Sequence, residues 1–272
     1  DTLSAANKEK FLMYFNSSLN KDVYICSSYF DIILSSTSVS SVAGHMAFEQ
    51  KPFRIDFMEG VAKRIIDILL SLLVLAFTLP LWLVIPIAIK LDSPGPVFYR
   101  QIRYTKNLRK FNIIKFRSMF VDADPDKAAL SGDKRITKVG SFIRATRIDE
   151  LPQIINVLKN DMSWVGPRAY MHGDVDERLK NDPEYLYRFN VKAGITGLQQ
   201  VRTNPGTDYR QKLRYDLYYI ANQSALFDLI ILFRTVGTIF EKGMSDGVDA
   251  ENISFPCFLI EQGVLSHTHW DY

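Results

Sequence analysis

The sequence predicts an α+β protein in which a mostly helical cytosolic body carries a short β-hairpin and is held at a membrane by a kinked helix. Three observations lead to this prediction: one long apolar run over residues 65–89, alternating apolar and polar residues over 97–119, and apolar residues at helical spacing in much of the remainder. With 272 residues, 47% of them hydrophobic and 23% charged, the chain is long enough for one large domain or two small ones.

Charge and cysteine content exclude several classes of protein. The formal net charge of +3 is too small to indicate nucleic-acid binding, and no groove-binding motif is present. The two cysteines, Cys26 and Cys257, are far apart and are accompanied by only four histidines, so neither a disulfide framework nor a metal-thiolate site is predicted. The chain is therefore expected to face the cytosol and not to bind nucleic acid.

Residues 1–56 give little chemical information. Short apolar runs at 23–25 and 32–34 fit strands, a helix is expected over 8–19, and serine-rich connectors such as 35–38 fit loops. This pattern is typical of the end of an α/β domain or of a linker.

Residues 57–96 are predicted to form a membrane anchor. The run from Ile65 to Ile89 is long enough to meet the bilayer, and Pro80 and Pro86 are expected to bend it. Lysine and arginine flank the run on both sides, which favours a re-entrant helix, broken in its middle, with both ends on the cytoplasmic side. A straight transmembrane helix and a buried core helix remain the alternatives.

Two short strands are expected directly after a turn-rich exit from this segment. Residues 97–101 and 110–119 alternate apolar and polar side chains, which is typical of a hairpin. Lys115 and Arg117 are two residues apart, so on a strand they project from the same face. They could be solvent-exposed side chains that bind no ligand, or they could hold a diphosphate or a lipid phosphate.

The stretch from Arg147 to Gln153 is the candidate reaction centre. Asp149 is expected to cap a helix that has Pro152 in its first turn, and Glu150 is its neighbour. Adjacent residues on a helix point about 100° apart, so the two carboxylates should have different roles. The alternative is that they only cap the helix and complement its dipole. Cations gathered nearby favour a site for a phosphate-bearing ligand, and these are Arg135, Lys138, Arg144, Arg147 and Arg168.

The C-terminal part is expected to be helical. Residues 209–221 carry apolar side chains at helical spacing, which predicts a packed core helix. Residues 224–242 have a broad apolar face, so this helix either lies amphipathically in the membrane interface or packs against the body. Residues 244–272 are predicted to be a tail, and His267 with His269 alone do not indicate a metal site.

Blocks of sequence in a fixed order span residues 57–243. They are Lys63-Arg64 with Asp67, Ser93–Gln101, Lys115–Met119, Asp149–Gln153, Asn156–Leu158, Asp161–Ser163, Val165–Arg168 and Gly194–Leu198. Together these blocks resemble the bacterial sugar transferase family, the monotopic polyprenyl-phosphate phosphoglycosyl transferases. The resemblance implies that residues 97–243 form the catalytic domain. It also suggests that residues 1–56 are the remnant of the extra N-terminal domain of the longer, two-domain members, shortened here at its N-terminus.

The resemblance implies an enzyme that moves a sugar 1-phosphate from a UDP-sugar to polyprenyl (undecaprenyl) phosphate and releases UMP. This would be the first step of surface polysaccharide synthesis, at the cytoplasmic face of the bacterial inner membrane. The family's nucleophile falls on Asp149, which would form an aspartyl phosphosugar, and the adjacent acid, implied to help place Mg²⁺, falls on Glu150. Residues expected to contact substrate are Lys115, Arg117, Arg147, Arg168, Arg202 and Asp216.

Three departures from the usual family pattern concern the positioning of the donor. Ala169 stands where Gly-Pro-Arg-Pro has its second proline, Lys192-Ala193 replaces Arg-Pro before Gly194, and Leu198 replaces a tryptophan. Losing two prolines is expected to loosen the turns without removing charge. Arg202 is the candidate substitute for an absent Gly-Arg.

Two other classes of protein stay open. One is a membrane-anchored scaffold or regulatory protein, and the other is a multi-span sugar-phosphate transferase, which a single long apolar run disfavours. The sequence does not identify the sugar or decide whether the chain forms a homo-oligomer.

Overall fold

The computed structural model describes residues 29, 32, 37–42, 45–49, 55–122, 133–204 and 206–241. The helix expected over 8–19, the strand over 23–25 and the tail 244–272 lie outside these residues. Ile32 is helical, so the strand expected at 32–34 is wrong at this residue; a three-residue apolar run does not distinguish the two structures. Two strands, β1 (Ser38–Val42) and β2 (His45–Glu49), form an antiparallel hairpin of their own.

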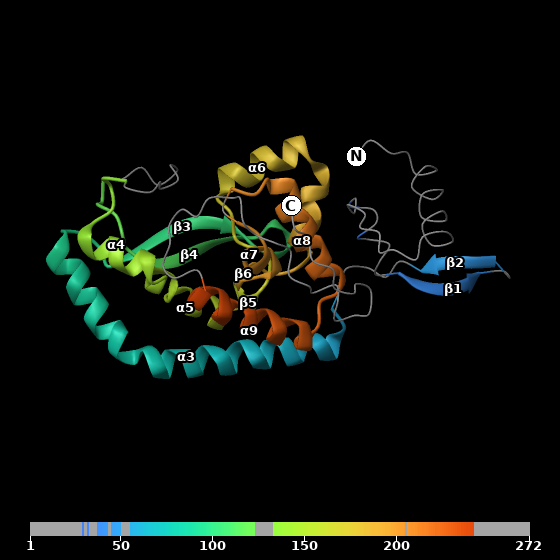
Figure 1. Cartoon of the computed structure of the whole chain (residues 1–272), viewed down its shortest axis with the longest axis horizontal. Helices are drawn as coiled ribbons and strands as arrows, with labels where there is room; N and C mark the ends of the chain where they lie inside the picture. Colours follow the sequence, from blue (N-terminus) through green and yellow to red (C-terminus); the bar gives the residue numbers. More distant parts are fainter. Residues whose placement is uncertain are drawn as a thin grey trace, which may run out of the picture. The chain divides into compact units, whose positions relative to one another are not determined.

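The apolar run lies in α3 (Phe57–Asp92), a single helix of 36 residues that begins at the capping residue Asp56. The helix continues through Pro80 and Pro86 and bends along its course (Figure 1). The bend was expected, but a break into two helices is wrong. A proline removes one backbone hydrogen bond, and the turns on either side can continue the helix. The re-entrant course stays a prediction.

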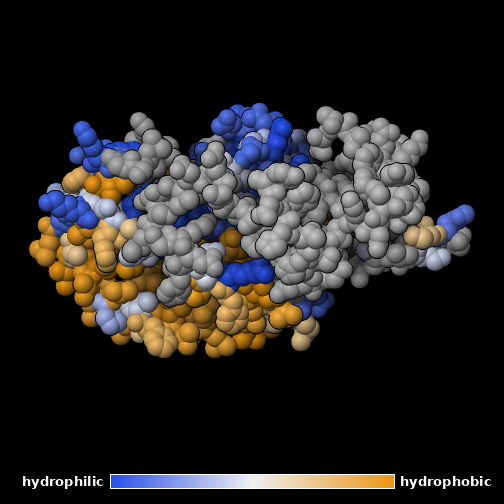
Figure 2. Space-filling model, viewed as in Figure 1, coloured by the Kyte–Doolittle hydropathy of each residue, from blue (hydrophilic) through white to orange (hydrophobic). Residues whose placement is uncertain are grey.

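The outer face of α3 is apolar and exposed. Its most apolar 18-residue window has a mean hydropathy of 2.7 and is only 11% buried, so α3 is not a buried core helix. Figure 2 shows a hydrophobic surface along this helix. Among the described residues, α3 is the one helix long and apolar enough to cross a membrane. Its exposed side chains include Phe57, Ile65, Leu69, Leu73, Phe77, Leu83, Ile87 and Leu91.

The inner face of α3 is fastened to the body near its start. The buried carboxylate of Asp67 accepts hydrogen bonds from Ser163 Oγ (3.0 Å) and from the backbone N of Trp164 (2.9 Å). The Arg64 guanidinium donates to the carbonyl oxygens of Val157 (2.7 Å) and Leu158 (2.9 Å), at the end of a helix of the body. These polar contacts join α3 to the segment that follows the candidate reaction centre.

A second, apolar contact holds the other end of α3. Ile85 and Ile89 are buried against Phe116 and Ile143 in one core cluster. Beyond this cluster, Ser93 and Pro94 turn the chain away from the helix, and their carbonyl oxygens accept hydrogen bonds from a buried arginine of the body. The helix is therefore attached to the body at two places well separated along its axis.

The predicted hairpin is confirmed. Strands β3 (Phe98–Tyr104) and β4 (Lys110–Phe116) pair antiparallel, with Tyr99 opposite Lys115. The connecting turn, η1 (Lys106–Leu108), has two consecutive left-handed residues, Asn107 and Leu108. Phe111 and Ile113 of β4 pack against Val157 and Met162, which places this strand over the centre of the body.

The remaining elements confirm an α+β fold. After the hairpin come α4 (Lys138–Ala145), η2 (Ile148–Glu150), α5 (Gln153–Leu158), β5 (Ser163–Val165), α6 (His172–Asn181), η3 (Pro183–Asn190), β6 (Gly194–Thr196), α7 (Leu198–Arg202), α8 (Tyr209–Ala221) and α9 (Ala225–Glu241).

Strands β5 and β6 form a two-stranded parallel sheet that the sequence did not indicate. Gly166 and Gly194 make its close approach possible. A Cβ on Gly194 would lie 2.2 Å from the Gly166 nitrogen, and one on Gly166 would lie 2.4 Å from the Lys192 oxygen. Only glycine fits at such contacts, so the turn after β5 is rigidly placed.

The two C-terminal helices follow their predicted patterns. Leu213, Leu217 and Ile220 of α8 are buried, as expected for a core helix. In α9 one face is buried and the opposite face, with Leu226, Phe233 and Val236, is exposed, so both the packing and the interfacial interpretations of this helix have a face to support them. Asp228 is a buried acid of α9: it pairs with the Lys63 ammonium of α3 and accepts a hydrogen bond from the Tyr219 hydroxyl.

Candidate active site

The dyad of Asp149 and Glu150 lies in η2, one turn ahead of α5. Arg147 precedes it with a left-handed backbone (φ 56°), an unusual conformation for a residue other than glycine. The prediction that Asp149 caps a helix is wrong, because Pro152 occupies the N-cap of α5. The nearby N–H groups are already used: Leu151 N donates to Ile148 O (3.0 Å). The Asp149 side chain is thereby left for another purpose.

Two cations from distant parts of the chain face Glu150. Lys115 of β4 donates to Glu150 Oε1 at 2.7 Å, and Arg168 Nη2 lies 3.9 Å from the same oxygen. Lys115 and Glu150 are largely buried, whereas 38% of the Arg168 side chain is exposed. The structure therefore brings together four of the predicted site residues: Lys115, Asp149, Glu150 and Arg168.

The two carboxyl groups of the dyad have different pKa values. Burial alone would raise the pKa of Glu150, but Lys115 and Arg168 outweigh it and lower the pKa to about 2. Burial raises the pKa of Asp149 to about 6, with Lys115 opposing that rise. Within the described part of the chain, no hydrogen bond or ion pair engages the Asp149 carboxylate. Glu150 is thus a fixed anion inside a cationic cluster, and Asp149 is a buried carboxylate available to react.

Arg103 is a site residue that the sequence analysis missed. Its guanidinium donates to Ala169 O (3.2 Å), the carbonyl directly after Arg168. Burial and the nearby charge of Arg168 lower its pKa, while Glu150 acts in the opposite direction. The sequence signal for Arg103 is its place on the strand that pairs with the Lys115 strand.

The profile of the bacterial sugar transferase family matches residues 58–242, which include all but the first residue of α3 and every residue of this site. The chain belongs to this family.

Curated relatives of this family member share its central region. A UDP-N-acetylgalactosamine-undecaprenyl-phosphate N-acetylgalactosaminephosphotransferase of Aeromonas hydrophila is 44% identical over 65% of this chain and 43% of its own length. A UDP-glucose:undecaprenyl-phosphate glucose-1-phosphate transferase of Caulobacter vibrioides is 43% identical over 65% of this chain and 69% of its own length. The exopolysaccharide production protein PSS of Rhizobium leguminosarum bv. phaseoli is 40% identical over 68% of this chain and 98% of its own length. The chain thus spans less than half of the first relative.

One departure from the usual sugar transferase pattern gains a contact that proline could not make. The backbone N–H of Ala193 donates to Thr105 Oγ1 (3.2 Å), and the same hydroxyl donates to Asp161 O (2.7 Å). Proline lacks this N–H. At Ala193 a buried hydrogen bond thus restrains the backbone in place of the proline ring, and a looser turn stays a prediction.

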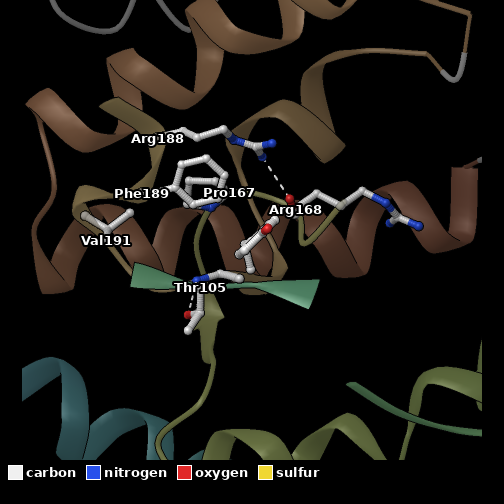
Figure 3. A pocket seen from close by; sticks show the side chains of 8 residues that line it. Thr105, Pro167, Arg168, Arg188, Phe189 and Val191 are labelled. Atoms are coloured by element: carbon white, nitrogen blue, oxygen red, sulfur yellow. Dashed lines mark hydrogen bonds between the residues drawn. The ribbon is translucent and has the colours of Figure 1, made fainter. Parts of the chain in front are cut away.

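Asp216 of this sugar transferase lies within the protein core and not beside the dyad carboxylates. It pairs with Arg188 at 3.0 Å, and both side chains are almost fully buried. Burial raises the pKa of Asp216 to about 6 although Arg188 opposes the rise. The Arg188 guanidinium also donates to the Tyr185 hydroxyl and to the backbone carbonyl of Arg168 (2.8 Å). Figure 3 shows the Arg168 side chain pointing away from Arg188. Arg188, which the sequence analysis did not single out, thus holds the turn that presents Arg168.

The three other predicted substrate residues have different surroundings. Arg117 is buried, and its terminal nitrogens donate to the carbonyl oxygens of Ser93 (2.7 Å) and Pro94 at the exit of α3. Its guanidinium is therefore engaged in fastening α3. Arg147 is exposed, and its charge lowers the pKa of both dyad carboxyl groups. Arg202 ends α7 and is half-buried, so its role stays a prediction.

The donor groups of the dyad are compatible with Mg²⁺. Within the described residues, no group of three or more histidine, cysteine or acidic side chains could hold a metal by itself. Magnesium, however, commonly binds one or two carboxylates together with substrate phosphate oxygens. Glu150, whose low pKa keeps it ionised, could supply such a ligand beside Asp149. The donor set fits a magnesium ion that arrives with a diphosphate.

Proposed function

We propose that this protein transfers a sugar 1-phosphate from a UDP-sugar to undecaprenyl phosphate and releases UMP, as the initiating step of surface polysaccharide synthesis. Its relatives from Aeromonas and Caulobacter bear names of this reaction. The observation that carries the proposal is the cluster itself: a buried, unengaged Asp149 next to a Glu150 that two cations hold. A scaffold or regulatory role would not require this arrangement and is not favoured.

Asp149 is proposed to act as the nucleophile. One of its carboxylate oxygens attacks the phosphorus next to the sugar, and the bond from that phosphorus to the UMP oxygen breaks. UMP leaves with the electron pair, and an aspartyl phosphosugar remains. An oxygen of the lipid phosphate then attacks the same phosphorus, and the bond to Asp149 breaks, which restores the carboxylate. Dividing one displacement into two easier steps is the usual benefit of a covalent intermediate.

The cations around the dyad offset the negative charge of the donor. A carboxylate attacks a phosphate anion slowly unless the charge of the phosphate oxygens is balanced. Lys115, Arg103 and Arg168, which interact with one another or with Glu150, are proposed to supply this charge, and the exposed Arg147 is proposed to add to it. Glu150, with the diphosphate oxygens, is proposed to hold Mg²⁺, which when bound supplies further positive charge.

The apolar faces of α3 and α9 are proposed to set the height of the site. The acceptor phosphate lies at the bilayer surface, so the dyad must be held close to that surface on the cytoplasmic side. A re-entrant α3, with basic residues at both ends, would place its exposed apolar face in one leaflet. The exposed residues of α9 would lie in the interface beside it.

The direct test is UMP release by the purified chain in detergent. It is supplied with undecaprenyl phosphate, Mg²⁺ and one UDP-sugar at a time from a panel that includes glucose, galactose and N-acetylgalactosamine. We expect UMP and a lipid-linked sugar phosphate in equal amounts with at least one donor. Absence of both products with every donor would contradict the proposal and favour the scaffold or regulatory protein instead.

The first chemical step should lose rate as the pH falls through about 6. Asp149 must be ionised to attack, and its pKa is raised to about 6, so the reactive fraction falls about tenfold per pH unit below that value. Glu150, with a pKa of about 2, does not titrate in this range. The measurement is the rate of UMP release in a single turnover, at UDP-sugar concentrations below KM and without the lipid acceptor. The acceptor is left out because its phosphate itself titrates near pH 6. A rate that stays constant down to pH 4 would rule out this assignment.

A further inference from the structure

A cationic hollow lies at the end of α5 that is remote from the dyad. Its volume is about 380 Å³, within the range of small-ligand pockets. Three separate segments line it: the turn between β3 and β4, the residues after α5, and the residue before Ala193. They supply the cations Lys106, Arg109, Lys159 and Lys192. Because α5 has six residues and an α-helix rises ~1.5 Å per residue, this hollow is separated from the dyad by about 9 Å of helix.

The walls of the hollow are held in place by buried contacts. Thr105 is 1% exposed; its hydroxyl donates to Asp161 O and accepts from Ala193 N, which ties the three segments together. Arg109 donates to the Asp161 carboxylate at 2.9 Å. Left-handed backbones at Asn107 and Asn160 shape two of the walls. The hollow is thus a fixed feature of the fold and not a chance grouping of long side chains.

Positive charge in the hollow exceeds the negative charge. Asp161, which pairs with Arg109, is the acidic partner that the structure shows for these cations, so three positive charges are left without an anionic partner among the described contacts. Lys192 is half-buried, and its ammonium donates to the neutral amide of Asn160. Burial and the neighbouring charge of Arg64 lower the pKa of Lys192. Bringing like charges together in a concave surface is unfavourable unless an anion binds there.

The hollow adjoins the anchor helix. Arg64 of α3 donates to the carbonyl oxygens of Val157 and Leu158, immediately before Lys159. One residue further along α3 is Ile65, which is 52% exposed on the apolar face. Lysines that border a membrane-embedded helix attract the phosphate groups of anionic lipids.

We infer that this hollow binds a phosphate group, supplied in the cell by the headgroup of an anionic phospholipid, and that this site is separate from the one that takes the donor and acceptor. The ammonium groups of Lys106, Lys159 and Lys192 would contact the phosphate oxygens from three sides. A lipid held there would attach the body to the membrane surface through contacts additional to those of the apolar helix.

The test compares two matched double variants of the full chain in nonionic detergent. In Lys106→Gln/Lys159→Gln the hollow loses two exposed lysines; in Lys134→Gln/Lys180→Gln the same charge is removed from exposed positions elsewhere. Each protein is titrated by calorimetry with short-chain phosphatidylglycerol, short-chain phosphatidylcholine and inorganic phosphate. We expect saturable binding of phosphatidylglycerol to the wild type and roughly 30-fold weaker binding to the hollow variant, from about fivefold for each of the two lysines. The control pair should differ from the wild type by less than about threefold because its charges are remote and screened.

Each outcome distinguishes a source or overturns the inference. If inorganic phosphate binds and is lost in the hollow variant while phosphatidylglycerol does not bind, the site takes a soluble phosphate and the lipid source is wrong. If both double variants weaken binding equally, or if neither anion binds saturably, the site does not exist. UMP release in detergent should be retained by the hollow variant, so failure of this inference leaves the proposed function standing.

Discussion

Asp149→Asn is expected to lower UMP release by about a thousandfold or more, because removing a nucleophile that forms a covalent intermediate typically costs at least this much. The amide has nearly the shape of the carboxylate but cannot attack phosphorus. Since the Asp149 side chain has no hydrogen bond or ion pair with other described residues, the substitution should not disturb the fold. The measurement is the initial rate of UMP release at saturating UDP-sugar and undecaprenyl phosphate.

The intermediate provides a second measurement on the same variant. Wild-type protein quenched after mixing with donor alone should carry the mass of a sugar phosphate on Asp149, and Asp149→Asn should carry none. Glu177→Gln, an exposed acid of α6, is the matched control and should retain both the rate and the adduct. Turnover by Asp149→Asn at near wild-type rate, or an adduct on another residue, would remove Asp149 from the role of nucleophile.

Lys115→Met is expected to lower kcat/KM by about a hundredfold or more, the usual cost of deleting a charge that stabilises a transition state. Methionine keeps much of the length and apolar stem but removes the ammonium 2.7 Å from Glu150. Among the described ion pairs, Glu150 would then retain the longer contact with Arg168, at 3.9 Å. The pKa of Glu150 should therefore rise. Steady-state kinetics with varied UDP-sugar would measure the effect.

Arg168→Met is the natural comparison for the lysine variant. Arg168 is more exposed and its contact with Glu150 is longer, so we expect a smaller loss, expressed mainly in KM for the donor. The melting temperature of Arg168→Met should stay near the wild-type value, because 38% of this side chain is exposed. Lys115→Met should melt at a lower temperature, because it leaves the largely buried Glu150 carboxylate without its closest cation. A Lys115→Met protein with wild-type kcat/KM would show that this cation is structural only.

The parts of this fold that the sequence predicted are those encoded by local patterns. The apolar run over 65–89 and the alternation over 97–119 identified α3 and the hairpin, since each pattern has the period of its own element. The dyad was recognised from neighbouring residues, Asp149 and Glu150. The local backbone at Asp149 was not predicted correctly, because a capping role for this residue depends on whether a three-residue turn or an α-helix begins there.

The parts that were missed depend on contacts between distant residues. The ion pair between Asp216 and Arg188 was not predicted, because nothing in the spacing of these two residues signals it. A substrate contact of Asp216 stays a prediction. The parallel strands β5 and β6 are three residues each, too short to carry a period. Arg117 was grouped with Lys115 by alternation, yet the carbonyl oxygens that it binds belong to the exit from α3.

The two attachments of α3 fix the number of residues that can lie between them. Asp67 and Ile89 must each face the body, and each additional residue between them would rotate the later attachment by about 100° and displace it by ~1.5 Å. One inserted residue would therefore swing Ile85 and Ile89 away from Phe116, whereas an insertion of about seven residues, close to two full turns, would restore the direction but carry the contact roughly 10 Å too far. Substitutions among the exposed apolar side chains do not change these directions, so α3 should tolerate changes of composition far better than changes of length.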